Sequence, residues 1–401
     1  MKIGILREGK TPIDRRAPLS PTQCRRFIES FPKARFIVQP SAARCFSDEE
    51  YDLKSLLLDN DLNDCELLLG IKEVQEKDLI PGKTYMFFSH TYKKQEYNKK
   101  LLKAILDNKI RLIDYELLRD QDKMRVIGFG RWAGIVGAYN GIRGYSIRYK
   151  LHEPHPAHTF DSYKEMLRHS GEIELPPIKI LVTGNGRVAH GALELLRALK
   201  IPKISGSDFL SGKSFDTPVF AQIDVDEYVK RKDENSFDMK HFMDNPGEYE
   251  NNFLRFIPVT DMLISAAYWD PKAPVLFTAE DMRKPDFRIK VIADITCDIK
   301  GSIPSTIRSA IIEDPFYGYN PETEKEELAF TNPNNITVMV VDNLPCELRR
   351  DASEEFGTTL VQKVLPEFFT GDKNRMLANA TIAENGKLTE RYKYLEDWVN
   401  S

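Results

Sequence analysis

The sequence has few cysteines, no long apolar run and no surplus of positive charge. Its cysteines are Cys24, Cys45, Cys65, Cys297 and Cys346. They are scattered and never spaced as C-x-x-C, which predicts reduced thiols rather than a disulfide framework or a zinc site. The charges nearly cancel, with 57 Lys and Arg residues against 61 Asp and Glu residues, whereas a protein that binds nucleic acid or anionic lipid needs a basic surplus or a clustered basic face.

The apolar runs are short. None approaches the roughly 20 residues that a membrane-spanning helix needs, and the start, MKIGILREGK, indicates a short strand followed by charges rather than a signal peptide. We therefore expect a cytoplasmic protein that binds neither membranes nor nucleic acid. With 401 residues, of which 41% are hydrophobic and 29% charged, the chain is long enough for two or three ordinary globular domains.

Short β-type runs alternate with helical stretches over the first 130 residues, which predicts an α/β domain with a mostly parallel sheet. The runs are KIGILRE, ARFIVQP, CELLLGIKEV, TYMFFSH, IRLIDYE and RVIGFG. Between them, helices are expected at 21–30 and 95–108, where apolar residues recur on one face. The Gly- and Ala-rich stretch 132–149 predicts a closely packed helix that leaves this domain.

A second set of β-type runs begins at IKILVTGNG and continues with TDMLISAAYW and FRIKVIADITC, which predicts a second parallel sheet. Residues 209–258 are polar and charged and are expected to form a solvated insertion. The last run, ITVMVVDNLP, is followed by two helical stretches. Periodicity alone does not assign these final elements to either domain.

Three histidines precede the second set of runs. His152, His155 and His158 have a spacing that could suit metal ligands. Pro154 and Pro156 prevent the helix that would align them, so we expect no metal site.

A glycine loop follows the strand-like run IKILV. The loop consists of Gly184, Asn185, Gly186, Arg187, Val188 and Ala189, and a helical stretch comes next. Gly184 permits a tight turn, Gly186 lets the backbone approach phosphates, and Ala189 lets the helix lie close to the strand. The loop therefore predicts a dinucleotide site with the pyrophosphate at the helix N-terminus.

An acidic residue after the loop would bind the adenosine ribose of NAD, whereas a basic residue there would favour NADP. The candidates are Asp208 and, after the strand-like PVFAQI, Asp224 or Asp226. The acids favour NAD.

Two ionisable residues close β-type runs in the first domain: Lys72 ends LLLGIK and His90 ends TYMFFSH. Side chains at the carboxyl ends of parallel strands point toward the crevice that binds ligands, and a desolvated lysine and a histidine both suit acid-base chemistry near neutral pH. A packed histidine and a solvated lysine are the structural alternatives.

Charged neighbours of these two residues suggest a site for carboxylates. Arg16, Lys93 and Arg125 could bind them, and Glu116 at the end of IRLIDYE could hold one of the cations. In the second domain, Asp294 and Asp298 flank the end of a strand near the expected nicotinamide position, although either could serve only in a turn.

Several longer runs resemble one known family. They are LREGKTPIDRRAPLSP, GIKEV, KTYMFFSHTYKKQE, IRLIDYE, RVIGFGRWAG, GNGRVAHGA, ISAAYWD, ADITCDIKGSI and VVDNLPCELRRDASEEFG. From about residue 3 to residue 370 the sequence is similar to the lysine-forming saccharopine dehydrogenases. It is most similar to the lysine-ketoglutarate reductase half of the bifunctional enzyme of lysine breakdown, and it is more distantly similar to alanine dehydrogenase.

The resemblance implies an α/β fold with two Rossmann-like, doubly wound domains and an interdomain cleft. A substrate domain would comprise residues 1–135 and 335–401, and a dinucleotide-binding domain of residues 136–334 would be inserted into it. The implied reaction interconverts saccharopine, NAD(P)+ and water with L-lysine, 2-oxoglutarate, NAD(P)H and a proton, so the partners would be small amino-acid and keto-acid substrates.

The resemblance also implies residue roles. Lys72 would exchange the proton of the secondary amine, and His90 would serve water addition and carbinolamine collapse. The residues expected to bind substrate are Arg16, Lys93, Glu116 and Arg125. The residues expected to bind the cofactor are Gly184, Gly186, Arg187, Val188, Asp208, Asp224, Tyr268, Asp298, Asp342, Leu344 and Pro345.

The sequence departs from parts of the family pattern. Reductases that prefer NADP carry basic residues where this chain has Asp224 and Asp226, which favours NAD, with NADP as the alternative. Alanine dehydrogenase continues from its aspartate into a glycine pair, whereas here Asp298 is followed by Ile-Lys-Gly. The alternatives are another amino-acid or opine-type dehydrogenase and a nucleotide-binding regulator without catalysis.

Overall fold

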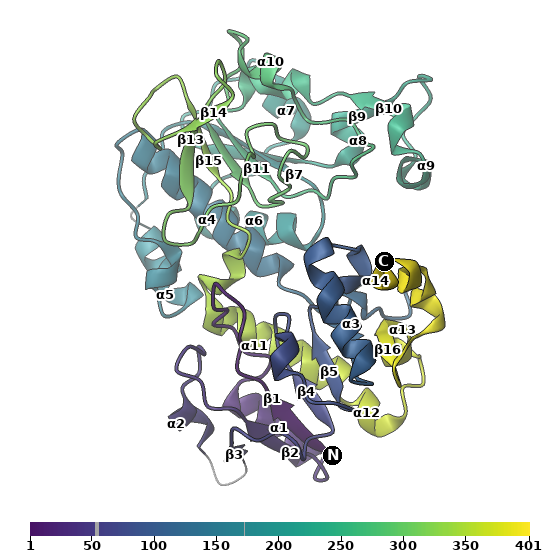
Figure 1. The fold of residues 1–401 in the computed structure, drawn as a ribbon. Helices are drawn as coiled ribbons and strands as arrows, with labels where there is room; N and C mark the ends of the chain where they lie inside the picture. The colour runs from purple at the N-terminus through teal and green to yellow at the C-terminus, as the bar shows by residue number, and fades with distance from the viewer. Residues whose placement is uncertain (53–55, 172) are drawn as a thin grey trace. The chain divides into compact units, whose positions relative to one another are not determined.

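The computed structural model describes residues 1–52, 56–171 and 173–401, and the chain divides into two compact units (Figure 1). Unit 1 comprises Met1–Phe129 and Arg349–Ser401, and unit 2 comprises Gly130–Leu348. Unit 2 is therefore inserted into unit 1, and both units have the α/β character that the sequence predicted.

Unit 1 is built on a sheet whose described strands follow the order β17-β16-β6-β5-β4-β1-β2-β3. The strands are β1 (Lys2–Ile5), β2 (Arg35–Val38), β3 (Leu56–Leu58), β4 (Leu67–Leu69), β5 (Thr84–Phe87), β6 (Arg111–Asp114), β16 (Thr381–Glu384) and β17 (Lys387–Leu388). Strands β1 to β6 are parallel, and β16 and β17 add an antiparallel edge. The strand order reverses between β1 and β4, and open α/β sheets bind ligands at such a switch point, beside the carboxyl ends of the strands.

The helices of unit 1 are α1 (Pro21–Ser30), α2 (Asp48–Tyr51), α3 (Lys99–Asp107), α11 (Arg349–Thr359), α12 (Glu367–Thr370), α13 (Met376–Ala380) and α14 (Glu396–Asn400). Helix α1 has the predicted bounds because Ser20 and Gln23 form a capping box and Pro21 opens the first turn. Helix α3 is shorter than expected, since Glu96–Asn98 forms a 3-10 turn before it.

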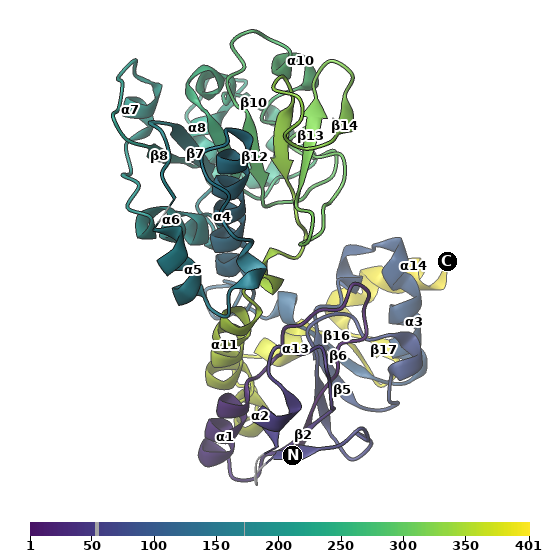
Figure 2. The same cartoon turned by 90° about the vertical axis from the view of Figure 1, so that its left-hand side faces the viewer.

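The C-terminal segment completes the core of unit 1. Helix α11 lies beside α1 (Figure 2). The side-chain Nε2 of Gln23 in α1 donates to the carbonyl oxygen of Glu354 in α11 at 2.7 Å. Ile382 and Leu395 are fully buried in the same apolar core as Phe87. Residues Met1–Phe129 therefore bury their sheet together with residues Arg349–Ser401.

Unit 2 is built on a sheet with the order β14-β13-β15-β12-β11-β7-β8 in the part of the chain described. Its strands are β7 (Lys179–Thr183), β8 (Val219–Ile223), β11 (Met262–Ser265), β12 (Val291–Asp294), β13 (Phe316–Asn320), β14 (Lys325–Glu327) and β15 (Ile336–Met339). The run from β8 to β15 is parallel. Here the order reverses between β7 and β11, so the expected ligand position is at the end of β7.

The helices of unit 2 are α4 (Gly130–Arg148), α5 (Tyr163–Ser170), α6 (Arg187–Ala198), α7 (Gly206–Leu210), α8 (Val225–Tyr228), α9 (Met239–Asp244) and α10 (Ala279–Met282), and a hairpin of β9 (Val229–Arg231) and β10 (Tyr249–Asn251) follows α8. Helix α4 packs against α6. A Cβ at Gly134 would overlap the carbonyl oxygen of Val188, and one at Gly191 would overlap that of Arg131. Glycine is therefore required for this contact, which accounts for the Gly-rich sequence of α4.

Two expectations about unit 2 need correction. The expected return to the first domain at residue 335 is too early, because β15 pairs with β12 and β13 before the chain re-enters unit 1 at Arg349. The stretch 209–258 is also not a wholly solvated insertion, since β8 pairs with β7 and Phe220 is fully buried.

Candidate functional site

The glycine loop of unit 2 has the geometry of a phosphate site. Strand β7 ends at Thr183, and Gly184 follows with φ at +93°. A Cβ at Gly184 would lie 2.9 Å from the Cα atom of Ala267, so both the backbone conformation and the close approach of the segment after β11 require glycine. Helix α6 then begins at Arg187, with Val188 in its first turn.

The N-terminus of α6 is open to a ligand. Its N-cap is Gly186, which supplies no side-chain cap, and a Cβ there would meet nothing within 4 Å. The first backbone N–H groups of a helix lack partners within it and carry a partial positive charge. A pyrophosphate fits this position, and the loop and helix residues Gly184, Gly186, Arg187 and Val188 would hold it.

The three candidate ribose acids lie on two segments, Asp208 on α7 and Asp224 and Asp226 at the start of α8. Asp224 directly follows β8, and the backbone N–H of Val225 donates to its carboxylate at 2.7 Å. Asp208 lies on α7, whose residue Phe209 accepts a hydrogen bond from Lys179 at the start of β7. Gly206, the first residue of α7, lies beside Ile223 and Glu227 at the carboxyl end of β8, so Asp208, Asp224 and Asp226 all stay candidates for the ribose position.

The remaining predicted cofactor residues follow strands of the same sheet. Tyr268 follows β11, is 81% exposed and lines a small hollow with Thr183 and Ala267. Asp298 and Asp342 are exposed in the segments after β12 and β15. Leu344 and Pro345, in contrast, are buried in the 3-10 turn Leu344–Cys346, which packs against α4.

Asp294, an alternative to Asp298, has a structural role. It is buried, and the hydroxyls of Thr296 and Thr306 each donate to it at 2.6 Å. Burial raises its pKa, and these hydrogen bonds partly oppose that effect. Asp294 therefore joins two segments of unit 2 rather than facing a ligand.

Four predicted residues form one cluster in unit 1. The carboxylate of Glu116 lies 3.1 Å from His90 Nδ1, 3.0 Å from Lys93 Nζ and 3.4 Å from Arg125 Nη1. Burial alone would raise the pKa of Glu116, but the hydrogen bond from His90 and the charges of Arg125 and Lys93 hold it below its usual range. Glu116 is thus the ionised centre of a cationic group.

The contact with Glu116 has a consequence for His90. A carboxylate only accepts, so Nδ1 of His90 carries the proton in this contact. Nε2 has no hydrogen-bond partner among the described residues, which leaves it available to a reactant.

Asp114 holds this cluster in place, although the sequence patterns did not single it out. Its carboxylate accepts hydrogen bonds from the backbone N–H groups of Ser89, His90 and Glu116 at 2.9, 3.1 and 2.8 Å. His90 has φ 54°, a left-handed conformation that costs a non-glycine residue about 1–3 kcal/mol. The fully buried Asp114 thus offsets the strain at His90.

Arg16 lies in a buried ion pair. Its Nε and Nη2 atoms donate to the two oxygens of Asp14 at 3.0 and 2.5 Å, and only 5% and 2% of these residues are exposed. The guanidinium also lies 4.1 Å from the ring centre of Phe129, which stacks on Phe356 of α11. One edge of the arginine is therefore committed to Asp14, a partner that the sequence patterns did not single out.

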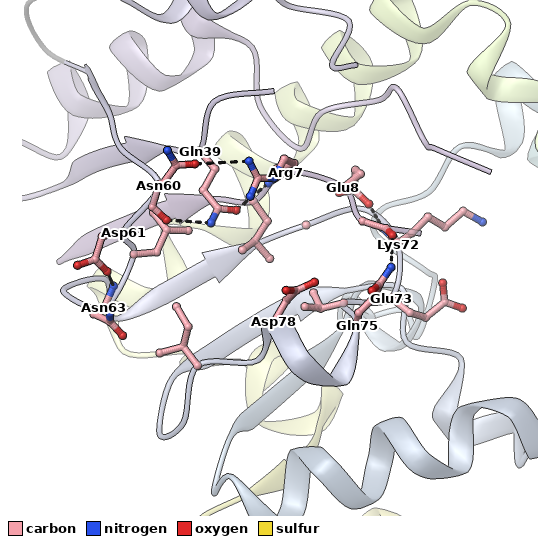
Figure 3. A pocket seen from close by; sticks show the side chains of 16 residues that line it. Arg7, Glu8, Gln39, Asn60, Asp61, Asn63, Lys72, Glu73, Gln75 and Asp78 are labelled. Atoms are coloured by element: carbon pink, nitrogen blue, oxygen red, sulfur yellow. Dashed lines mark hydrogen bonds between the residues drawn. The ribbon is translucent and has the colours of Figure 1, made fainter. Parts of the chain in front are cut away.

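Lys72 follows β4 as His90 follows β5, and these strands are neighbours. The backbone N–H groups of Ile71 and Lys72 donate to the two oxygens of Glu8, at 2.6 and 2.9 Å. Desolvation and the charge of Asp14 raise the pKa of Glu8 to about 8. Glu8 was not predicted from the sequence, and it fixes the backbone that carries Lys72 (Figure 3).

The described residues hold neither a metal-ligand cluster nor a spanning helix. Within residues 1–52, 56–171 and 173–401, no three His, Cys, Asp or Glu side chains are grouped to bind a metal ion. No helix over the same ranges has the length and apolar character to cross a membrane.

Comparison with known proteins identifies relatives over the whole chain. Residues 4–136 match the family "Alanine dehydrogenase/PNT, N-terminal domain". The sequence is 30% identical over 437 positions to alpha-aminoadipic semialdehyde synthase of Arabidopsis thaliana, with 98% of this chain and 41% of that protein aligned. It is 30% identical over 444 positions to the mitochondrial alpha-aminoadipic semialdehyde synthase of Mus musculus, with 98% of this chain and 47% of that protein aligned. The chain thus spans less than half the length of these relatives.

A shorter relative aligns over most of its length. Saccharopine dehydrogenase [NAD(+), L-lysine-forming] of Emericella nidulans is 26% identical over 382 positions, which cover 90% of each chain. Among solved structures, an L-alanine dehydrogenase has a TM-score of 0.66 at 14% identity and covers 100% of both chains. A transhydrogenase from Sinorhizobium meliloti has a TM-score of 0.59 at 15% identity and covers 97% of this chain and 99% of its own. These two structures confirm the fold.

Proposed function

Because this chain is homologous to the lysine-forming saccharopine dehydrogenases and contains an alanine dehydrogenase/PNT N-terminal domain, we propose that it is a lysine-forming saccharopine dehydrogenase. The reaction interconverts saccharopine and water with L-lysine and 2-oxoglutarate, and NAD, when bound, accepts or donates the hydride at the carbon beside the secondary nitrogen. The observation that carries this proposal is the ionic cluster of His90, Lys93, Glu116 and Arg125, next to the strand end that bears Lys72.

In the forward direction the secondary amine must lose a proton before its neighbouring carbon is oxidised to an imine. Lys72 takes that role with its side chain as the neutral amine, which then becomes the ammonium, since Nζ has no hydrogen-bond partner among the described residues while Glu8 fixes its backbone. Water then adds to the imine carbon, and the carbon–nitrogen bond breaks to release the amine of lysine. His90 takes and returns the protons of these steps through Nε2, because Glu116 holds Nδ1.

The cations of the cluster suit a dicarboxylate. Lys93 and Arg125 share one carboxylate, that of Glu116, so the group has positive charge to offer to 2-oxoglutarate or to the matching end of saccharopine. Arg16 would add a further contact to a substrate carboxylate. Asp224 after β8 supports NAD rather than NADP as the cofactor.

The test is NADH oxidation in the presence of both L-lysine and 2-oxoglutarate. We expect turnover that requires both substrates, and we expect His90→Gln to keep its NADH affinity while losing most of that activity. Turnover with 2-oxoglutarate alone, or faster turnover with pyruvate and ammonia, would favour another amino-acid dehydrogenase. NADH binding without turnover of any amino acid would favour a regulator.

A further inference from the structure

A cavity of about 270 Å³ opens at the carboxyl ends of β1, β2, β3 and β4 in unit 1 (Figure 3). It lies at the switch point between β1 and β4, where sheets of this type bind ligands. Its lining comes from four separate segments, represented by Arg7 after β1, Gln39 after β2, Asn60 after β3 and Lys72 after β4. None of the cluster residues around Glu116 belongs to this lining.

The lining presents both signs of charge. Figure 3 shows Arg7 on one side of the cavity, beside Gln39 and Asn60, and Asp78 on the opposite side. The guanidinium of Arg7 makes only a long contact of 3.4 Å to Asn60 Oδ1 in the described residues. Asp78 is exposed, and its carboxylate has no ion pair among the described residues. A ligand with one carboxylate and one ammonium group would pair with both.

The acidic side chains outnumber the basic ones in this lining. The acids are Glu8, Asp61, Glu73 and Asp78, and the bases are Arg7 and Lys72. A dianion such as 2-oxoglutarate is therefore disfavoured there, whereas the cationic cluster around Glu116 suits it. The lining reaches Lys72, whose strand adjoins the strand that carries His90. A substrate in the cavity can therefore present its reacting nitrogen beside Lys72 while its far end remains between Arg7 and Asp78.

We propose that this cavity binds the amino-acid end of the amine substrate, with Arg7 on its α-carboxylate and Asp78 on its α-ammonium group. The proposal rests on the proposed function, since it assigns one of the two substrates of that reaction to its own subsite. It predicts selection for a free α-amino acid over a simple diamine of the same length.

The experiment compares L-lysine with cadaverine, which has the same chain but no carboxylate, in wild type and in Arg7→Gln. Wild type should use L-lysine at a much lower KM than cadaverine. Arg7→Gln loses one charge-assisted contact, which should raise the KM for L-lysine about 10- to 100-fold. The KM values for 2-oxoglutarate and cadaverine should stay unchanged. The variant should therefore lose the preference for L-lysine over cadaverine. Arg26→Gln, on the exposed face of α1, is the matched control and should behave as wild type.

A second variant and a binding measurement separate the possible failures. Asp78→Asn should raise the KM for L-lysine but not for 6-aminohexanoate, which lacks the α-ammonium group. If wild type turns over and both variants keep their discrimination, the cavity assignment is wrong. If wild type does not turn over, the proposed function is wrong, and calorimetric titration of L-lysine into wild type and Arg7→Gln still decides whether the cavity binds an amino acid.

Discussion

The replacement Glu116→Gln tests the role of the ionic cluster most sharply. The carboxylate orients His90 by accepting from Nδ1 at 3.1 Å and also offsets part of the positive charge of Lys93 and Arg125. Glutamine has nearly the same shape, but its amide can present either a donor or an acceptor to Nδ1, so His90 loses its fixed tautomer. Catalysis should fall while the fold remains.

The expected loss of kcat follows from the hydrogen bond between Glu116 and His90 that the replacement removes. A hydrogen bond to a charged group contributes about 1.5–3 kcal/mol, and each 1.36 kcal/mol of transition-state stabilisation is a factor of ten in rate. Glu116→Gln should therefore lower kcat by about 10- to 150-fold. Because the pKa of Glu116 is held below its usual range, the carboxylate is ionised throughout neutral pH, and its own titration adds no pH dependence to the loss.

The assay is NADH oxidation with L-lysine and 2-oxoglutarate, together with a thermal denaturation curve for each variant. Glu96→Gln, at an exposed ion pair with Lys99 in the same unit, makes the identical chemical change and should keep wild-type activity. Glu116→Asp keeps the charge and should recover part of the rate. A Glu116→Gln variant that folds and retains kcat within a factor of two would refute an orienting role for this carboxylate.

Other changes give separate tests. Asp14→Asn removes the carboxylate that pairs with the buried Arg16 and should lower the free energy of unfolding, measured in urea, by about 3–5 kcal/mol. Asp64→Asn, at an exposed ion pair, should leave the urea midpoint unchanged. Equal effects of the two replacements would contradict a stabilising role for the buried pair. Gly184→Ala should lower the free energy of unfolding by about 1–3 kcal/mol, because the φ of +93° at this position does not suit an L-residue. It should also weaken NADH binding, measured by fluorescence titration. Unchanged NADH affinity would count against the glycine loop as the cofactor site. The pKa of Glu8 is about 8 in the folded protein and about 4.3 when unfolded, so folding favours its protonated form. Thermal stability should therefore fall as pH rises from 6 to 9, and it should fall less in Glu8→Gln. Parallel stability curves for wild type and Glu8→Gln would contradict this role of Glu8.

The sequence predicted the parts of the site that follow strands directly. Lys72 and His90 each close an apolar run of the kind that forms a buried parallel strand, and the glycine loop follows a third such run, so local pattern was enough to place them. The same reasoning placed Glu116 at the end of a strand. The positions of these residues are set by short stretches of sequence, and the hydrophobic pattern of a short stretch is enough to predict a strand and its end.

The supporting carboxylates could not be predicted in this way. Glu8 accepts hydrogen bonds from backbone N–H groups more than 60 residues away in sequence. Asp114, at the end of β6, accepts hydrogen bonds from the backbone N–H groups of Ser89 and His90, which follow the neighbouring strand β5. Their roles arise from strand order, which no local pattern contains.

Transfer of deuterium from the reduced cofactor to the product is the most direct test of the central claim. Enzyme, L-lysine, 2-oxoglutarate and NADH deuterated at C4 of the nicotinamide would be incubated together, and the product analysed by mass spectrometry and NMR. The account predicts saccharopine with one deuterium at the carbon that joins the lysine nitrogen to the glutarate skeleton. Consumption of NADH with no such product, or deuterium in a simple amino acid formed from ammonia and a keto acid, would contradict it.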